Sequence, residues 1–321
     1  MIPMKVRVIL GFVAIILSRD APAQDLRTEL QQKSVASGLA LGYIGGSAME
    51  IFPTAGGPLT NELLENYSGP CRICPGWFSS DGNLVIWLNQ PFNERSRQPL
   101  IIRTIKGNTV RAWSGEIFAE IRALALSPDR SRVAVEQRID SRSSLRGGLQ
   151  YFALSTPNRV VIEPQPSREE ASGSESVGWS PDSRSIVFSR HGKVIILNIE
   201  IGNRREIASG TNPSWSPDGQ WISFTAPEGV PMLVAPSGHA PVILWKGRRI
   251  SGPMAWSPDS AYLSFSASEK DVTRMIVYRV RDGEWLPLAQ FGSEGGYSNG
   301  FGWLYNYKDF LAYNESKKPR E

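Results

Sequence analysis

Six copies of one short motif follow one another along the chain. Four are nearly identical: Ala-Leu-Ser-Pro-Asp-Arg at residues 125–130, Gly-Trp-Ser-Pro-Asp-Ser at 178–183, Ser-Trp-Ser-Pro-Asp-Gly at 214–219 and Ala-Trp-Ser-Pro-Asp-Ser at 255–260. Residues 78–82 and 302–306 hold two degenerate copies. Self-similarity at a period of about 40 residues indicates that one supersecondary unit is repeated around a ring or along an array.

Each copy predicts two strands joined by a tight turn. Seven and nine residues after Trp179 come Ile186 and Phe188, and the other copies place apolar residues at matching positions. These positions differ by two, so both side chains leave the same face of a strand. We call the large apolar residue directly before the turn of each copy its anchor and predict a structural core role for all six: Phe78, Leu126, Trp179, Trp215, Trp256 and Trp303.

The Ser-Pro-Asp-Gly segment after the anchor suits a type I turn, in which the aspartate bonds its own backbone. Five copies carry this residue: Asp81, Asp129, Asp182, Asp218 and Asp259. Because each belongs to a different repeat, we interpret them as turn residues and not as ligands of one metal ion.

Two further strand-like runs follow each hairpin, as at residues 193–199 and 205–208. Four short antiparallel strands per repeat are typical of a propeller blade. The sequence therefore predicts an all-β, six-bladed β-propeller of four-stranded antiparallel blades over residues 38–313, with blades one to six at 75–313.

The last blade is short of strands, because only residues 300–304 and 310–313 remain before the charged tail at 314–321. A spare hairpin with a Gly-Gly turn lies at residues 38–53. We expect this N-terminal hairpin to complete blade six and close the ring, since proteins avoid open sheet edges. Short helices are predicted at 26–33, within the N-terminal segment 24–37, and at 61–65.

Residues 1–23 are typical of a secretory signal peptide. Lys5 and Arg7 give a basic start, residues 8–17 are apolar, and Ala21-Pro22-Ala23 offers a small-x-small cleavage site. The rival interpretation is an uncleaved signal anchor, although ten apolar residues are too few to span a bilayer. We expect a periplasmic or secreted protein with no membrane span after signal removal.

Composition argues against a nucleic-acid partner. Cleavage removes three basic residues and one acidic residue, which lowers the formal net charge from +4 to +2. A net charge of this size does not indicate a basic surface that would bind a polyanion such as a nucleic acid. A hydrophobic content of 41% and ten tryptophans are consistent with one large core, and we expect a monomer.

The repeated Trp-Ser-Pro-Asp-Gly motif with its apolar-x-apolar strand resembles the WD40-like (PD40) repeats of TolB-type six-bladed propellers. The resemblance covers about residues 75–313 plus the N-terminal hairpin. It implies a periplasmic platform for other envelope proteins. The separate α/β domain that precedes the propeller in TolB has no room before the first motif, so we do not expect TolB itself.

The remaining candidate residues lie in loops. Cys71 and Cys74 are the only cysteines, and in an oxidising compartment we expect a local disulfide. His191 and His239 are too few for a histidine metal site, and we expect no cofactor. Aromatic residues outside the anchor positions are candidate partner contacts: Tyr297, Tyr305 and Tyr307.

The leading functional hypothesis is a non-catalytic interaction module for envelope proteins, because no catalytic set stands at recognisable spacing. A small-molecule or glycan binder that uses the channel mouth is the alternative. A propeller hydrolase or lyase is a third, which would need converging Asp, Glu or His side chains on one rim.

Overall fold

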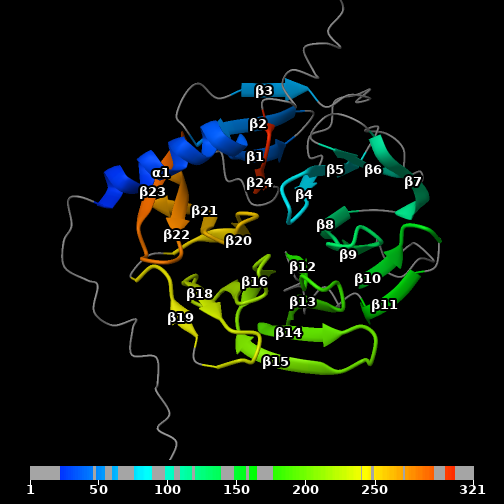
Figure 1. Cartoon of the computed structure of the whole chain (residues 1–321). Helices are drawn as coiled ribbons and strands as arrows, with labels where there is room; N and C mark the ends of the chain where they lie inside the picture. Colours follow the sequence, from blue (N-terminus) through cyan, green and yellow to red (C-terminus); the bar gives the residue numbers. More distant parts are fainter. Residues whose placement is uncertain are drawn as a thin grey trace, which may run out of the picture.

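A computed structural model describes residues 22–45, 48–54, 60–63, 76–88, 98–104, 109–117, 120–138, 148–156, 159–164, 176–239, 241–246, 249–269, 272–292 and 301–307. Within these residues the strands form six four-stranded antiparallel sheets. The sheets stand around a central axis as the blades of a β-propeller (Figure 1). The fold class predicted from the repeats is confirmed.

Blades one to three follow the chain from the first motif, and each begins at the central axis. Blade one holds β4 (Gly76–Phe78), β5 (Leu84–Leu88), β6 (Gln98–Thr104) and β7 (Thr109–Ile117). Blade two holds β8 (Glu120–Leu126), β9 (Arg132–Arg138), β10 (Gly148–Ala153) and β11 (Arg159–Pro164). Blade three holds β12 (Val177–Trp179), β13 (Ser185–Arg190), β14 (Lys193–Asn198) and β15 (Arg204–Ser209).

Blades four and five repeat the same order from inside to outside. Blade four holds β16 (Thr211–Trp215), β17 (Ile222–Thr225), β18 (Pro231–Val234) and β19 (Val242–Ile243). Blade five holds β20 (Ser251–Trp256), β21 (Tyr262–Glu269), β22 (Val272–Arg279) and β23 (Trp285–Gly292).

Blade six joins the two ends of the chain. Its order is β24 (Phe301–Leu304), β1 (Ala40–Gly45), β2 (Ala48–Pro53) and β3 (Thr60–Leu63). β1 pairs antiparallel with β24, and Leu41 stands opposite Trp303. The expected closure by the N-terminal hairpin is confirmed.

The division of strands within blade six differs from the expectation. The N-terminal segment supplies three strands, not two, because β3 pairs with β2 from Thr60 opposite Ile51 to Leu63 opposite Ala48. The helix predicted at residues 61–65 is therefore wrong for residues 61–63. Pairing with an open sheet edge outweighed a weak local helical preference. The strand expected at residues 310–313 lies outside the described residues.

The predicted helix at residues 26–33 is present within α1 (Pro22–Ser37), which lies against blade five (Figure 1). Leu26 and Leu30 are fully buried in a cluster with Tyr262, Trp303 and other apolar residues of blades five and six. Glu29 accepts hydrogen bonds from Arg279 (2.6 Å) and Arg281 (2.9 Å). No helix in the described part of the chain is both long and apolar enough to cross a membrane.

The period-two pattern of each second strand builds the contacts between blades. Ile186 and Phe188 of β13 pack with Ala134 and Leu149 of blade two. The side chain between them, Val187, belongs to the cluster of Ile222 and Phe224 in blade four. Alternate residues of one strand thus face opposite neighbours, so each blade is buried on both sides.

The closure predicts that removing β1 and β2 unfolds the whole ring. A chain that begins at residue 54 leaves β24 without its neighbour and exposes the cluster around Trp303. We expect it to lose its cooperative thermal transition, followed by circular dichroism and tryptophan fluorescence.

The matched control is a chain that begins at residue 38 and loses α1 alone. It keeps every described strand, so we expect cooperative melting at a lowered midpoint. If the chain from residue 54 melts like the full-length protein, the closure by β1 does not carry the stability of the ring.

Candidate functional site

Five of the six motif turns adopt one backbone shape, which orients the innermost strands. The fourth turn residue has a positive φ in these five copies: Gly82 (68°), Arg130 (59°), Ser183 (60°), Gly219 (77°) and Ser260 (59°). The degenerate last copy differs, because its positive φ lies one position earlier, at Asn306 (54°), whose amide donates to the Ser37 carbonyl. In the Ser183 turn the amide of this residue donates to the Ser180 carbonyl at 2.9 Å. Glycine adopts this conformation at the lowest cost, which explains its place in the motif.

The motif aspartates are bound within their own turns. In blade three, Asp182 Oδ1 accepts hydrogen bonds from the Ser180 hydroxyl and, at 3.0 Å, from the Arg184 amide. The hydrogen bond from Ser180 lowers the pKa of Asp182, and desolvation opposes this shift. Asp81, Asp129, Asp218 and Asp259 make the equivalent pair of bonds.

Two of these carboxylates also hold neighbouring elements. Asp81 pairs with Arg130 of the next blade at 2.7 Å, and Asp259 pairs with Lys33 of α1. Among the residues that the structure describes, no group of three or more His, Cys, Asp or Glu side chains is placed to hold a metal ion.

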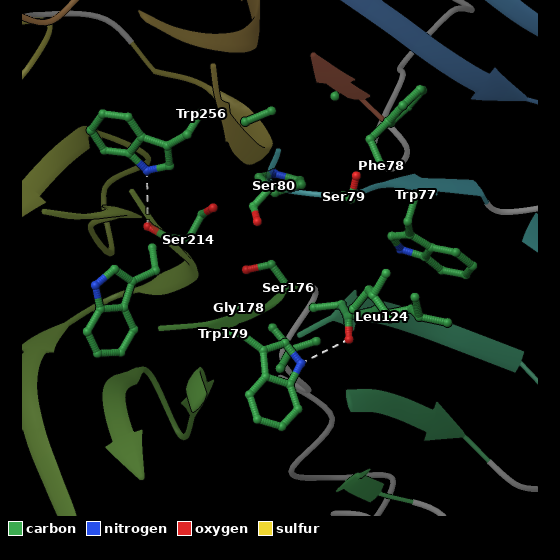
Figure 2. A pocket seen from close by; sticks show the side chains of 18 of the residues that line it. Trp77, Phe78, Ser79, Ser80, Leu124, Ser176, Gly178, Trp179, Ser214 and Trp256 are labelled. Carbon is green, nitrogen blue, oxygen red and sulfur yellow. Dashed lines mark hydrogen bonds between the residues drawn. The ribbon is translucent and has the colours of Figure 1, made fainter. Parts of the chain in front are cut away.

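The tryptophan anchors connect adjacent blades through their indole N–H groups. Trp179 Nε1 donates to the Ala125 carbonyl at 3.0 Å, Trp256 Nε1 to the Ser214 carbonyl at 3.2 Å, and Trp303 Nε1 to the Ala255 carbonyl at 3.1 Å. Figure 2 shows the bonds of Trp179 and Trp256. Each acceptor residue directly precedes the anchor of the preceding blade.

The remaining anchors depart from this pattern. Trp215 Nε1 is buried and has no hydrogen-bond partner among the described residues, while Phe78 and Leu126 have no N–H to donate. Trp179, Trp256, Trp303 and Leu126 are 2–6% exposed, whereas Phe78 and Trp215 are half-buried. The contacts that the anchors make between adjacent blades are therefore not equivalent.

The residue before each anchor is small in five copies, for a steric reason. A Cβ added at Gly302 would lie 2.4 Å from atoms of Phe78, and one at Gly178 would lie 3.2 Å from Val187. Blade one is the exception, since it carries Trp77 at this position. Trp77 is half-buried and packs against the cluster of Leu124 and Leu126.

The innermost strands surround a central cavity of about 160 Å³. Its lining is mostly aromatic, alanine and glycine, and the hydroxyls of Ser80, Ser176 and Ser214 lie around its middle (Figure 2). Among the residues that the structure describes, no titratable side chain lines this cavity. The cavity is also smaller than ordinary ligand pockets of roughly 300–1,000 Å³.

A buried ion pair joins blades two and three. Glu136 on β9 and Arg190 on β13 each expose 4% of their side chains, and Arg190 Nη2 lies 3.3 Å from Glu136 Oε2. Burial raises the pKa of Glu136, while the positive charges of Arg190 and Arg122 act in the opposite direction.

Sequence reasoning missed this pair, although the repeat contains a signal for it. Glu136 stands ten residues after its anchor, where other copies have Ser189, Thr225 and Ser266. These three hydroxyl residues are buried as well. A charged residue at a position that is otherwise small and buried indicates a buried partner.

Large exposed apolar side chains lie on the outer parts of three consecutive blades. They are Val160 and Val161 on β11, Ile201 between β14 and β15, and Val242 and Ile243 on β19, with exposed fractions of 44–75%. We call these five the outer-rim residues. Val35 of α1 is similarly exposed.

The loop candidates are placed as follows. Cys71, Cys74 and Tyr297 lie outside the described residues. Tyr305 is half-buried, and its burial and the charge of Asp259 raise its pKa. Tyr307 is 8% exposed and its amide donates to the Gly38 carbonyl, so little of its side chain is available to a partner.

The two histidines lie at the surface in turns. His191 is exposed with a φ of 50°, and His239 is exposed with Nδ1 at 2.7 Å from the Ser237 hydroxyl oxygen.

Comparison with solved structures shows that this chain shares the fold of other propellers. No protein-family model matches the chain, and no curated protein sequence matches it. TolB from Acinetobacter baumannii is similar with a TM-score of 0.58 and 14% identity, over 83% of this chain and 66% of TolB, just under two thirds of it. A chain of the nidogen/laminin complex is similar with a TM-score of 0.57 and 9% identity, over 83% of this chain and 98% of that chain. At these identities the likeness shows the shared propeller fold alone.

The unequal indole bonds predict unequal effects of Trp→Phe substitutions. Trp179→Phe removes a hydrogen bond and leaves the Ala125 carbonyl without that donor, whereas Trp215→Phe removes an N–H that has no partner. We expect the loss in unfolding free energy to be larger for Trp179→Phe by about 1 kcal/mol. Guanidinium denaturation measures both variants, and equal losses would contradict the assigned bond pattern.

The ion pair predicts a stability loss that depends on pH. Arg190→Leu leaves Glu136 buried without its partner, and we expect it to lower stability at pH 7 by about 3 kcal/mol. The pKa of Glu136, already raised in the fold, then rises further. The folded state takes up a proton before the unfolded state does, so the loss shrinks as the pH falls toward the ordinary glutamate value.

Two controls accompany Arg190→Leu in urea denaturation at several pH values. Arg184→Leu removes an exposed ion pair with Glu200, and we expect a change within about 0.5 kcal/mol. The double variant Glu136→Leu/Arg190→Leu is expected to recover much of the loss. A loss for Arg190→Leu that does not change with pH would show that Glu136 is not the group left unpaired.

Proposed function

We propose that this chain is an exported, non-catalytic propeller that binds other proteins of the cell envelope through its outer surface. The observation that carries the proposal is the position of its apolar side chains. The central cavity is narrow and lacks titratable groups, while the outer-rim residues expose isoleucine and valine to solvent. Exposed apolar side chains can anchor a protein partner.

The outer rim of blades three and four is the part that we assign to the partner. Ile201 is 75% exposed at the turn between β14 and β15, and Val242 and Ile243 are 50% and 44% exposed on the short β19. Arg205 of β15 donates to the Ser237 carbonyl at 3.1 Å and also to the Pro236 carbonyl, so the outer strand of blade three is tied to the turn between β18 and β19 of blade four. A surface held in one arrangement binds with a smaller entropic cost.

The likeness to other propellers supports a binding role as a class. The similar chain of the nidogen/laminin complex belongs to an assembly of proteins. The resemblance of the repeats to TolB-type propellers implies a periplasmic platform for envelope proteins.

Export through a cleavable signal peptide is part of the proposal. The basic start, the apolar run and the small residues at 21–23 support it. Cleavage after Ala23 would remove only the first two residues of α1 and keep Leu26, Glu29 and Leu30, which hold the helix on blade five.

A small-molecule binder is the second candidate, and the serine hydroxyls around the cavity favour it. The cavity of about 160 Å³ is near the size at which engineered apolar cavities accept benzene. Such a ligand would be small, with an apolar body and a polar group that bonds to the serine hydroxyls, so this observation does not favour a glycan inside the channel.

Affinity capture tests the protein-binding function. Tagged mature protein, residues 24–321, is incubated with crosslinked envelope extract and the captured proteins are identified by mass spectrometry. We expect one reproducible envelope protein in near-stoichiometric amount, because a specific interface selects its partner.

The matched variant replaces apolar rim residues with charged ones, as in Ile201→Asp/Val242→Asp. Both positions are exposed, so we expect the fold to persist and the capture to fall at least about tenfold if they lie at the interface core. Capture of nothing above background by the wild-type protein would contradict the interaction function and favour the small-molecule candidate.

A further inference from the structure

The innermost strand of blade four carries a bulge beside the central cavity. β16 pairs with β17 on both sides of this bulge, but Asn212 and Pro213 have no partner of their own in the ladder. The Pro213 carbonyl accepts a hydrogen bond from the Ser176 hydroxyl at 2.7 Å. Ser176 and Ser214, the residue after the bulge, both line the cavity (Figure 2). The bulge therefore borders the cavity, and bulges are common beside active sites, where they redirect a side chain.

Two side chains at the bulge bury polar atoms that have no partner. Asn212 is 7% exposed and Thr225 is 6% exposed. The Asn212 Oδ1 and Thr225 Oγ1 atoms have no hydrogen-bond partner among the described residues. The two residues are close in the sheet, because Thr225 stands opposite Thr211, which directly precedes Asn212. Buried polar atoms without a partner lower stability, so two together indicate a group that they bind.

The backbone does not require an asparagine at this bulge. Asn212 has a φ of 53°, and it precedes Pro213, where an extended backbone is preferred. In blade five the pairing of β20 with β21 shifts at the corresponding place, and there Gly252, with a φ of 76°, precedes Pro253. Glycine adopts a positive φ at lower cost than asparagine. The carboxamide of Asn212 is therefore retained against both backbone preference and burial.

We propose that Asn212 and Thr225 form the polar end of a small-molecule site whose apolar part is the central cavity. Asn212 Oδ1 can only accept a hydrogen bond, so the ligand carries an N–H or O–H donor. No titratable side chain lines the described cavity, so the ligand is neutral. The cavity of about 160 Å³ limits its apolar body to roughly the size of benzene. The ligand class is a small primary amide or alcohol with such a body.

This inference rests on the second candidate function, the small-molecule binder, and adds the polar group that this ligand must carry. It is independent of the outer-rim residues, which we assign to a protein partner. A hydrocarbon of the same size would leave both buried oxygens unpaired. A carboxylate would bring only acceptors to Asn212 Oδ1 and would bury a charge. A site built to bond a donor rejects both analogues.

A titration with three probes of similar size tests this selectivity. Benzamide carries the donor, toluene lacks any polar group, and benzoate carries acceptors only. Ligand-observed NMR with the mature chain, residues 24–321, measures the three affinities. We expect benzamide to bind at least about tenfold more tightly than toluene or benzoate, because only benzamide satisfies the buried oxygens.

Two variants locate the polar end. Thr225→Val keeps the shape of the side chain and removes the hydroxyl, and Asn212→Gly restores the residue type that blade five uses. We expect each to weaken benzamide binding at least about fivefold. The thermal midpoint of Thr225→Val should stay the same or rise, since an unpaired hydroxyl is removed. A side chain with only a structural role would lower the midpoint when it is replaced.

Ser266→Ala is the matched control. Ser266 occupies the position of Thr225 in blade five, is 2% exposed and also has a hydroxyl without a partner among the described residues. Its removal should leave benzamide binding unchanged. Benzamide that does not bind, that binds no more tightly than toluene or benzoate, or that keeps its affinity in both bulge variants overturns the inference. These results leave the capture of an envelope protein by the outer rim as a separate test.

Discussion

The pairing of β1 with β24 is the contact on which the rest of the propeller depends. It joins residues 40–43 to residues 301–304 and turns a row of blades into a ring. The cluster of Leu41, Trp303 and Tyr262 forms only when the two chain ends meet, and α1 covers it from outside. Because β1, β2 and β3 all come from the N-terminal segment, blade six is three parts N-terminal and one part C-terminal. The first and last segments of the ordered fold therefore fold together or not at all.

Ring closure explains why the described innermost strands leave only a narrow channel. The innermost strands must approach one another closely, which is why Gly178 and Gly302 stand where a Cβ would meet a neighbouring side chain. The anchor indoles then bond across the seams, and the residual cavity of about 160 Å³ is lined without a charged group. Functional residues that vary between propellers are therefore expected at the periphery, where the loops and outer strands are not part of the repeated motif.

The sequence predicts the structure well at residues that belong to the repeat and poorly at residues outside it. The turn around Asp182, the strand with Ile186 and Phe188, and the closing hairpin at residues 40–53 follow from periodicity and from the avoidance of open edges. The local sequence predicts a helix at residues 61–65, where β3 lies, because the pairing of β3 with β2 is a tertiary contact that no local pattern contains. The Glu136–Arg190 pair could not be predicted for a similar reason. The two charged residues are 54 positions apart in the sequence, and only the placement of adjacent blades side by side brings them together. The exposure of Ile201 and Val242 also depends on where the outer strands end.

The buried ion pair, the unpaired indole and the exposed outer-rim residues all belong to blades two, three and four. Glu136 and Arg190 join blades two and three, Trp215 leaves its N–H unpaired between blades three and four, and the exposed outer-rim residues belong to blades two, three and four. Blades five and six keep the anchor bonds of Trp256 and Trp303 and are reinforced by α1. A repeat protein gains nothing in stability from a buried ion pair or an unpaired indole, since apolar residues fill such positions at lower cost. The ion pair and the unpaired indole are therefore features that stability alone does not select, and they lie in the same blades as the outer-rim residues that we assign to a partner.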